Sequence, residues 1–142
     1  MTDTSAGLPW KAVGLIGLTG VVMGVVTAVV GIPPALLPVC WLGFYVLWVV
    51  VVLRRSTPRP FVTLTLGSLL SGAFTGGIQS ALLTQFRAAN PWWAAEMDPV
   101  GDPELVRALL VQGLGAGLVF GLAVGGVAWA LARRRARPDP AP

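Results

Sequence analysis

Four long apolar stretches constrain the fold of this 142-residue chain more than any other feature. They cover residues 12–32, 35–53, 61–83 and 105–132, and an α-helix needs about 20 apolar residues to cross the hydrocarbon core of a bilayer. Arg107, near one end of the last stretch, is the only charged residue within them. The sequence therefore predicts an all-α integral membrane bundle of four transmembrane helices in a single domain, with short polar tails at residues 1–9 and 133–142.

The composition excludes several classes of function. Soluble domains are about 25% charged, whereas this chain is 11% charged and 55% hydrophobic. The chain has no histidine, so the common zinc and iron sites cannot be assembled, and its single cysteine, Cys40, cannot form an intrachain disulfide. Its net charge of +4 comes from basic residues at the ends of the apolar stretches. We therefore expect no cofactor, no metal and no nucleic-acid partner.

Lysine and arginine residues predict how the helices are oriented, because short loops rich in them stay in the cytoplasm. Arg87 and Arg107 lie on one side of the predicted spans. The other eight basic residues lie on the opposite side: Lys11, Arg54, Arg55, Arg59, Arg133, Arg134, Arg135 and Arg137. We expect a multi-pass protein of the cell (cytoplasmic) membrane with both termini in the cytoplasm.

The first apolar stretch has an alternative interpretation as a cleavable signal peptide. Its apolar core of about 20 residues is longer than the roughly 7–15 residues of such segments. No clear A-x-A cleavage site follows it. We therefore predict a retained helix.

Glycines at four-residue spacing predict which helix faces pack. Glycine is a poor helix former in water, but it lets helix backbones approach closely in lipid. Such pairs or runs occur in the first, third and fourth spans: Gly20 and Gly24; Gly72 and Gly76; Gly113, Gly117, Gly121 and Gly125. We expect these three spans to form the tight centre, with the bulkier second span at the periphery. The spacing leaves open whether the partner helix belongs to the same chain or to a second copy.

Polar residues recur along one face of the third span. Ser71, Thr75 and Gln79 follow at four-residue spacing, and Gln112 of the fourth span should lie at a depth similar to that of Gln79. One interpretation is a set of interhelical hydrogen bonds, including one between Gln79 and Gln112, each contributing about 0.6 kcal/mol. The other is a polar cavity for a small solute or water. An ion-coupled carrier is disfavoured because no ionisable residue lies deep in the spans.

The segment between the third and fourth spans, residues 87–104, carries further signals. The Asn-Pro pair at 90–91 predicts a short helix over residues 91–97, and Trp92 and Trp93 favour a position at the membrane interface. We expect these tryptophans to form an outer surface for a partner protein. Asp102 is the predicted N-cap of the fourth helix. The acidic residues here match no calcium-binding loop, so no metal site is predicted: Glu96, Asp98, Asp102 and Glu104.

The order of these elements resembles a family of small bacterial four-helix membrane proteins of unknown function. The likeness covers about residues 61–97: an aromatic-opened third helix with Phe61, Gly67, Gly72 and Gly76, followed by a segment that begins with Asn90. The tryptophan pair and the glycine run of the fourth span are not features of that resemblance. It implies a topology and no activity.

The sequence-based prediction of function is a non-enzymatic membrane protein that acts through helix packing, as a homo-oligomer or as a small accessory subunit of a membrane complex. Its partners would be membrane lipid and either itself or another membrane protein. The alternative is a small channel, carrier or lipid-handling protein that uses the polar face of the third helix. An enzyme is disfavoured because the usual acid–base and nucleophile pairs are missing.

Overall fold

The structure, a computed structural model, describes residues 7–97 and 101–135. Within these ranges the chain forms six helices and no strand: α1 (Trp10–Val29), α2 (Leu37–Arg54), α3 (Pro60–Ala81), α4 (Leu83–Ala89), α5 (Pro91–Met97) and α6 (Asp102–Arg135). Four of them, α1, α2, α3 and α6, are long and apolar enough to cross a membrane. The chain is thus an all-helical, multi-pass membrane protein.

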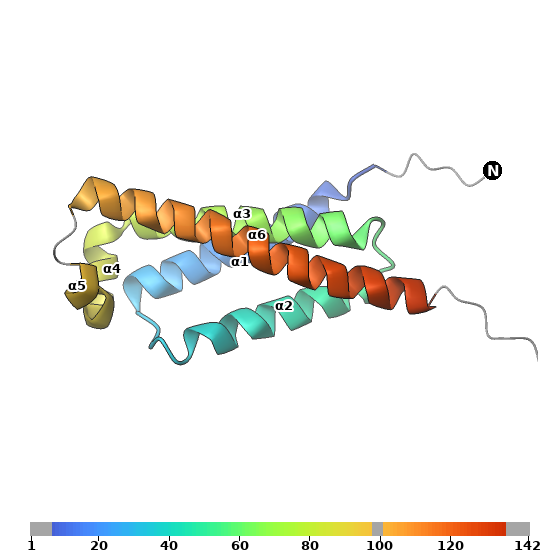
Figure 1. The fold of residues 1–142 in the computed structure, drawn as a ribbon, viewed down its shortest axis with the longest axis horizontal. Coiled ribbons are helices and arrows are strands. Elements are labelled where there is room, and N and C mark those ends of the chain that lie inside the picture. Colours follow the sequence, from blue (N-terminus) through green and yellow to red (C-terminus); the bar gives the residue numbers. More distant parts are fainter. Residues whose placement is uncertain (1–6, 98–100, 136–142) are drawn as a thin grey trace, which may run out of the picture.

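The four long helices lie lengthwise and alternate in direction along the chain (Figure 1). The short helices α4 and α5 lie at the end where α1 finishes and α6 begins, which we call the α4–α5 end. The start of α1, the α2–α3 connection and the last turn of α6 lie at the opposite end. Arg87 and Arg107 are therefore at the α4–α5 end, and the other described basic residues are at the opposite end.

The helix boundaries differ from the expected ones for local reasons. Helix α1 ends at Val29 rather than at residue 32, because Gly31 adopts a φ of 76° and the Val30 and Gly31 N–H groups both donate to the Val26 carbonyl. Helix α3 ends at Ala81, and the chain bends at Leu82 into α4.

The expected N-cap at Asp102 is wrong. Asp102 is the first residue of α6, and the carbonyl of the preceding Gly101 accepts the N–H of Leu105. The Asp102 carboxylate instead accepts a hydrogen bond from the Arg87 guanidinium at 2.8 Å. This ion pair connects α4 to the start of α6.

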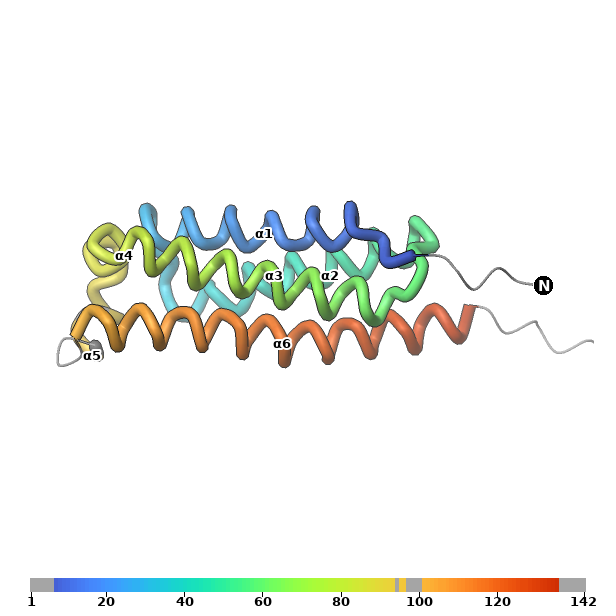
Figure 2. The backbone as a smooth tube through the Cα atoms, turned by 90° about the horizontal axis from the view of Figure 1, so that it is seen from above, coloured from blue at the N-terminus to red at the C-terminus, as the bar shows by residue number. Residues whose placement is uncertain are grey.

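Helix α3 lies between α1 and α6, and glycines bring the three backbones together (Figure 2). On the α6 side, Gly72 and Gly113 face each other so closely that a methyl group on either would overlap the other's carbonyl oxygen. A methyl group on Gly117 would come 2.6 Å from the Ser68 carbonyl oxygen. On the α1 side, Gly20 lies directly against the Ser71 backbone. In this chain the glycine faces are therefore occupied by helices of the same chain.

The remaining glycines of these runs occupy similar positions. Gly76 faces the Leu109 backbone, Gly24 faces the Ile78 side chain, Gly121 faces Thr65 and Ser68, and Gly125 faces Phe61. Any larger side chain at these positions would displace a neighbouring helix or side chain.

Helix α2 packs against the other helices mainly near its C-terminal end. Val52 is its only buried residue, and it contributes to a cluster with Ile16, Leu64 and Ala128. Trp48 and Val49 pack on the same cluster. Toward the α4–α5 end, α2 contributes no buried residue, and side chains there line a cavity.

Candidate functional site

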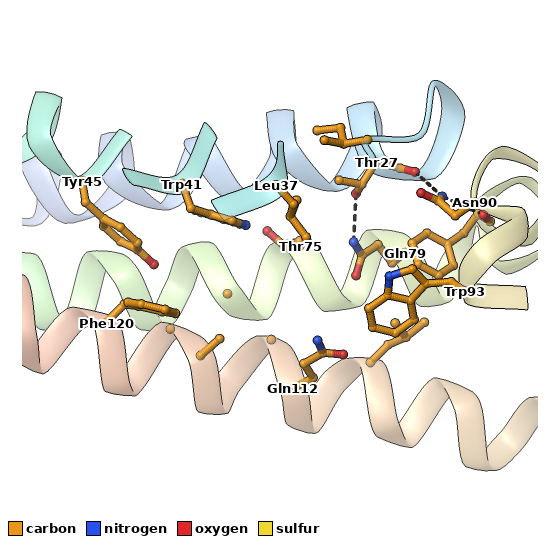
Figure 3. Close-up of a pocket in the computed structure, with 17 residues that line it drawn as sticks. Thr27, Leu37, Trp41, Tyr45, Thr75, Gln79, Asn90, Trp93, Gln112 and Phe120 are labelled. Atoms are coloured by element: carbon orange, nitrogen blue, oxygen red, sulfur yellow. Dashed lines mark hydrogen bonds between the residues drawn. The ribbon is translucent and has the colours of Figure 1, made fainter. Parts of the chain in front are cut away.

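A cavity of about 110 Å³ lies between α2 and the other helices, toward the α4–α5 end (Figure 3). Helix α2 contributes Leu37, Trp41 and Tyr45, which are four residues apart and so share one helix face. Across the cavity, α6 contributes small residues, including Gly113 and Ala116. Residues of α1, α3, α4 and α5 complete the wall. The site thus exists because α2 is separated from α6 at this level.

Aromatic pairs lie toward the two ends of the cavity. Tyr45 of α2 stacks on Phe120 of α6, with ring centroids 5.5 Å apart and an interplanar angle of 26°, and Trp41 stacks on Tyr45 at 5.9 Å. Toward the α4–α5 end, Phe86 and Trp93 meet edge to face at 6.0 Å. Figure 3 shows Trp41 and Tyr45 on the α2 side of the cavity, Phe120 on the α6 side and Trp93 toward Asn90. Aromatic side chains of α2, α4, α5 and α6 therefore form part of the cavity lining.

The cavity opens sideways between α2 and α6. The α6 residues Gln112, Ala116 and Phe120 line it and are also exposed, and the Phe120 side chain is 50% exposed. In a membrane, this side of the molecule faces acyl chains.

Amide and hydroxyl groups give the cavity its polar character. The Gln79 side-chain N–H donates to the Thr27 hydroxyl at 2.8 Å, and Thr27 in turn donates to the Met23 carbonyl at 2.6 Å. The Gln112 amide and the Tyr45 hydroxyl point into the cavity in Figure 3, and both residues line it. The site therefore offers hydrogen-bonding groups from two opposite walls.

The structure assigns a different partner to Gln79 from the expected one. The predicted hydrogen bond between Gln79 and Gln112 is absent from the described residues, and Gln79 bonds to Thr27 of α1. Both glutamines nevertheless line the same cavity, as does Thr75. Ser71 lies instead at the α1–α3 contact, where its hydroxyl is 3.2 Å from that of Thr19.

Asn90 is a structural residue of the site whose role the sequence analysis missed. Its side chain is 3% exposed, and its amide donates to the carbonyls of Thr27 and Phe86, both at 2.8 Å. The Thr27 carbonyl is in the last turn of α1, where the helix supplies no N–H donor. Asn90 therefore completes the end of α1 and fixes the wall formed by α4 and α5.

The two tryptophans of α5 are not equivalent. Trp93 lines the cavity and packs against the cluster of Ala28, Phe86, Leu105 and Leu109. Trp92 is half-buried, and its indole N–H is buried with no partner in the described part of the chain. Trp93 thus faces the interior rather than an outer partner.

Among the residues that the structure describes, no charged side chain and no cysteine line the cavity. In the described ranges, no group of three or more acidic or cysteine residues is placed to hold a metal ion. The arrangement can therefore bind an uncharged group through packing and hydrogen bonds.

Comparisons of the chain with protein-family models, curated proteins and solved structures give no match. The resemblance to small bacterial four-helix membrane proteins stays a prediction. The geometry of the cavity is the basis for the functional argument that follows.

Proposed function

We propose that this chain is a non-enzymatic protein of the cell membrane that holds one membrane amphiphile in the cavity between α2 and α6. The observation that carries this proposal is the sideways opening, where exposed Gln112, Ala116 and Phe120 also line the cavity. Such an opening gives a lipid direct access, because it faces the acyl chains. The uncharged lining supports binding over ion transport, which normally uses ionisable groups within the membrane.

In this proposal, α1, α3 and α6 are the rigid part of the bundle and α2 is its peripheral helix. The backbone contacts at Gly20 and Gly72 support the first part, and the lone buried Val52 of α2 supports the second. Function through self-assembly on the glycine faces has less support, because those faces pack within the chain. The short helix α5 would lie at the membrane interface, where tryptophan is favoured.

The proposed orientation puts the end with Lys11, Arg54, Arg55 and Arg135 in the cytoplasm. Lysine and arginine at that end outnumber those at the α4–α5 end, which has Arg87 and Arg107.

Labelling of single cysteines tests this orientation. In a Cys40→Ala background, a membrane-impermeant maleimide added to intact cells should label Ala95→Cys in α5. It should label Ser56→Cys, in the α2–α3 connection, only after the membrane is opened, because the positively charged loop is retained in the cytoplasm. Labelling of the Ser56→Cys variant in intact cells would show that the orientation is the opposite of the proposed one.

A cavity-filling variant tests the proposed binding. Ala116 is exposed to the cavity, so phenylalanine there should fill the space without entering the α3–α6 contact. We expect wild-type protein purified in mild detergent to retain one amphiphile per chain, and Ala116→Phe to lower the retained amount at least tenfold. Solvent extraction followed by mass spectrometry measures the amount.

The matched control is Ala108→Phe, an exposed position two turns earlier on α6 that does not line the cavity. It should retain the amphiphile at the wild-type level, and both variants should unfold at nearly the wild-type temperature. Equal retention by Ala116→Phe and wild type, or no stoichiometric amphiphile in the wild type, would refute the proposed function.

A further inference from the structure

The lining of the cavity specifies more than a general amphiphile. Resting on the proposed function, we infer that the ligand is an uncharged lipid with a flat ring that bears carbonyl oxygens, which is the chemistry of an isoprenoid quinone. The inference concerns binding of the ring in the cavity and assigns no electron transfer to this chain. Four features of the site carry it: its depth, its size, its flat walls and its hydrogen-bond donors.

The depth of the site favours an uncharged group. Gln112 lies seven residues after Leu105, where the apolar part of α6 begins. At 1.5 Å per residue, this places Gln112 about 10 Å from Leu105 along the helix, within the apolar part of α6. A phosphate or carboxylate at that depth would need a cationic partner, and no charged side chain of residues 7–97 and 101–135 lines the cavity. The ligand group at Gln112 is therefore neutral.

The size and shape of the site favour a single flat ring. Its volume of about 110 Å³ is close to the roughly 150 Å³ of an engineered apolar cavity that binds benzene. On the α6 side, Gly113 and Ala116 leave the helix surface low and open. On the α2 side, Tyr45 is stacked between Trp41 and Phe120, so the aromatic face left for a ligand is that of Trp41. A ring fits between these walls with its face toward aromatic groups, an arrangement that favours offset stacking.

The polar groups favour carbonyl oxygens on that ring. The Tyr45 hydroxyl and the Gln112 amide are hydrogen-bond donors on opposite walls and point into the cavity (Figure 3); Tyr45 is half-buried and Gln112 is exposed, so both donors are accessible to a ligand. In an apolar medium, a hydrogen-bond donor without an acceptor is unfavourable in free energy. A quinone ring carries an acceptor oxygen on each of two opposite sides, so it can satisfy both donors at once. The tail would leave through the opening between α2 and α6 into the bilayer.

A neutral glycerolipid also has carbonyl acceptors, but it lacks a flat ring. Its ester groups are flexible and present no flat face to Trp41. The stacked Trp41 and Tyr45 would then contribute no specific contact. The quinone is therefore the occupant that uses all four features.

Tryptophan fluorescence of the protein in phosphatidylcholine nanodiscs tests the inference. Quinones quench nearby indoles, and Trp41 and Trp93 both line the cavity. Titration with a decyl-substituted benzoquinone should give a saturable quenching component at one ligand per chain, and Trp41→Phe should reduce its amplitude. Decylbenzene, added as a competitor, should not remove it, because the hydrocarbon has no carbonyl oxygens.

The amide and hydroxyl variants test the hydrogen bonds. Gln112→Leu and Tyr45→Phe should each raise the Kd of the saturable quenching component at least tenfold, since each removes one hydrogen-bond donor to the ring. The matched control is Gln85→Leu in α4, which removes an exposed glutamine that does not line the cavity and should leave binding unchanged. Unchanged binding in both the Gln112→Leu and Tyr45→Phe variants would overturn the inference.

Other outcomes are equally decisive. Quenching that never saturates, or competition by decylbenzene as strong as that by the quinone, would overturn the inference, as would displacement by diacylglycerol at equal concentration. If quinone binding fails while Ala116→Phe still expels a retained amphiphile, the proposed function stands and only the ligand class is wrong. If no amphiphile is retained and no quinone binds, both the proposed function and the inferred ligand class are wrong.

Discussion

Substitution of Gly72 by alanine is expected to destabilise the protein by about 3 kcal/mol, the upper end of the usual cost of overpacking. The added methyl group would overlap the Gly113 carbonyl oxygen and approach the Gly117 Cα to 3.1 Å. These are backbone atoms of α6, so no side-chain rotation relieves the overlap. Helices α3 and α6 would have to separate, which would also weaken the hydrogen bond from the Thr65 hydroxyl to the Gly121 carbonyl.

The matched control for this variant is Gly115→Ala. Gly115 is on α6, two residues from Gly113, and a methyl group there meets nothing within 4 Å. Since alanine is favoured over glycine in a helix by up to about 1 kcal/mol, this variant should be as stable as wild type or slightly more stable. Reversible unfolding in mixed micelles measures the free energy of unfolding of both variants. Equal stability of the two variants would show that the α3–α6 contact is not as close as described.

The second large effect is expected from Asn90→Asp, which keeps the side-chain size and removes both N–H donors. At neutral pH, a buried carboxylate would then face the carbonyl oxygens of Thr27 and Phe86, to which Asn90 now donates. We expect the free energy of unfolding to fall by about 3 kcal/mol or more. Losing two buried hydrogen bonds and adding an unpaired buried charge costs more than losing the hydrogen bonds alone. The unfolding temperature at pH 7 measures the effect.

Asn90→Ala separates the lost bonds from the added charge. It removes the same donors without a carboxylate, so its expected cost is smaller, about 1–3 kcal/mol. Hydrogen exchange should show faster opening of the last turn of α1 in both variants, because the Thr27 carbonyl loses its partner. If Asn90→Asp were as stable as wild type, Asn90 would not hold α1 to α4 as the structure shows.

The four long helices could be predicted from the sequence because their apolar stretches are long and nearly uncharged. The residues at which these helices end were less predictable from the sequence. Gly31 stops α1 through its positive φ, and the Arg87–Asp102 ion pair depends on where α4 lies. The chain bends at Leu82, where the sequence has neither proline nor glycine, so no local signal marked the end of α3.

The cavity depends on tertiary placement that sequence spacing does not specify. Thr75, Gln79 and Gln112 were considered as lining residues from their types and depth, but spacing within one helix could not identify Thr27 of α1 as the partner of Gln79. Asn90 was interpreted only as a helix-start residue, because its contacts with Thr27 arise from the fold of α4 against α1. The aromatic wall from α2 required knowing that α2 is separated from α6 at this level.

Helix α6 is much longer than the helix beside it. Gly125 lies opposite Phe61, in the first turn of α3, so most of the last ten residues of α6 extend past the start of α3, although Ala128 among them is still buried in the cluster with Val52 and Leu64. Val127, Trp129 and Leu131 in this extension are exposed and apolar, and the Arg133 guanidinium lies 4.0 Å from the centre of the Trp129 ring. Unequal hydrophobic lengths on neighbouring helices create hydrophobic mismatch. The surrounding bilayer must therefore be thicker beside α6 than beside α3, or the whole bundle must tilt to bury both.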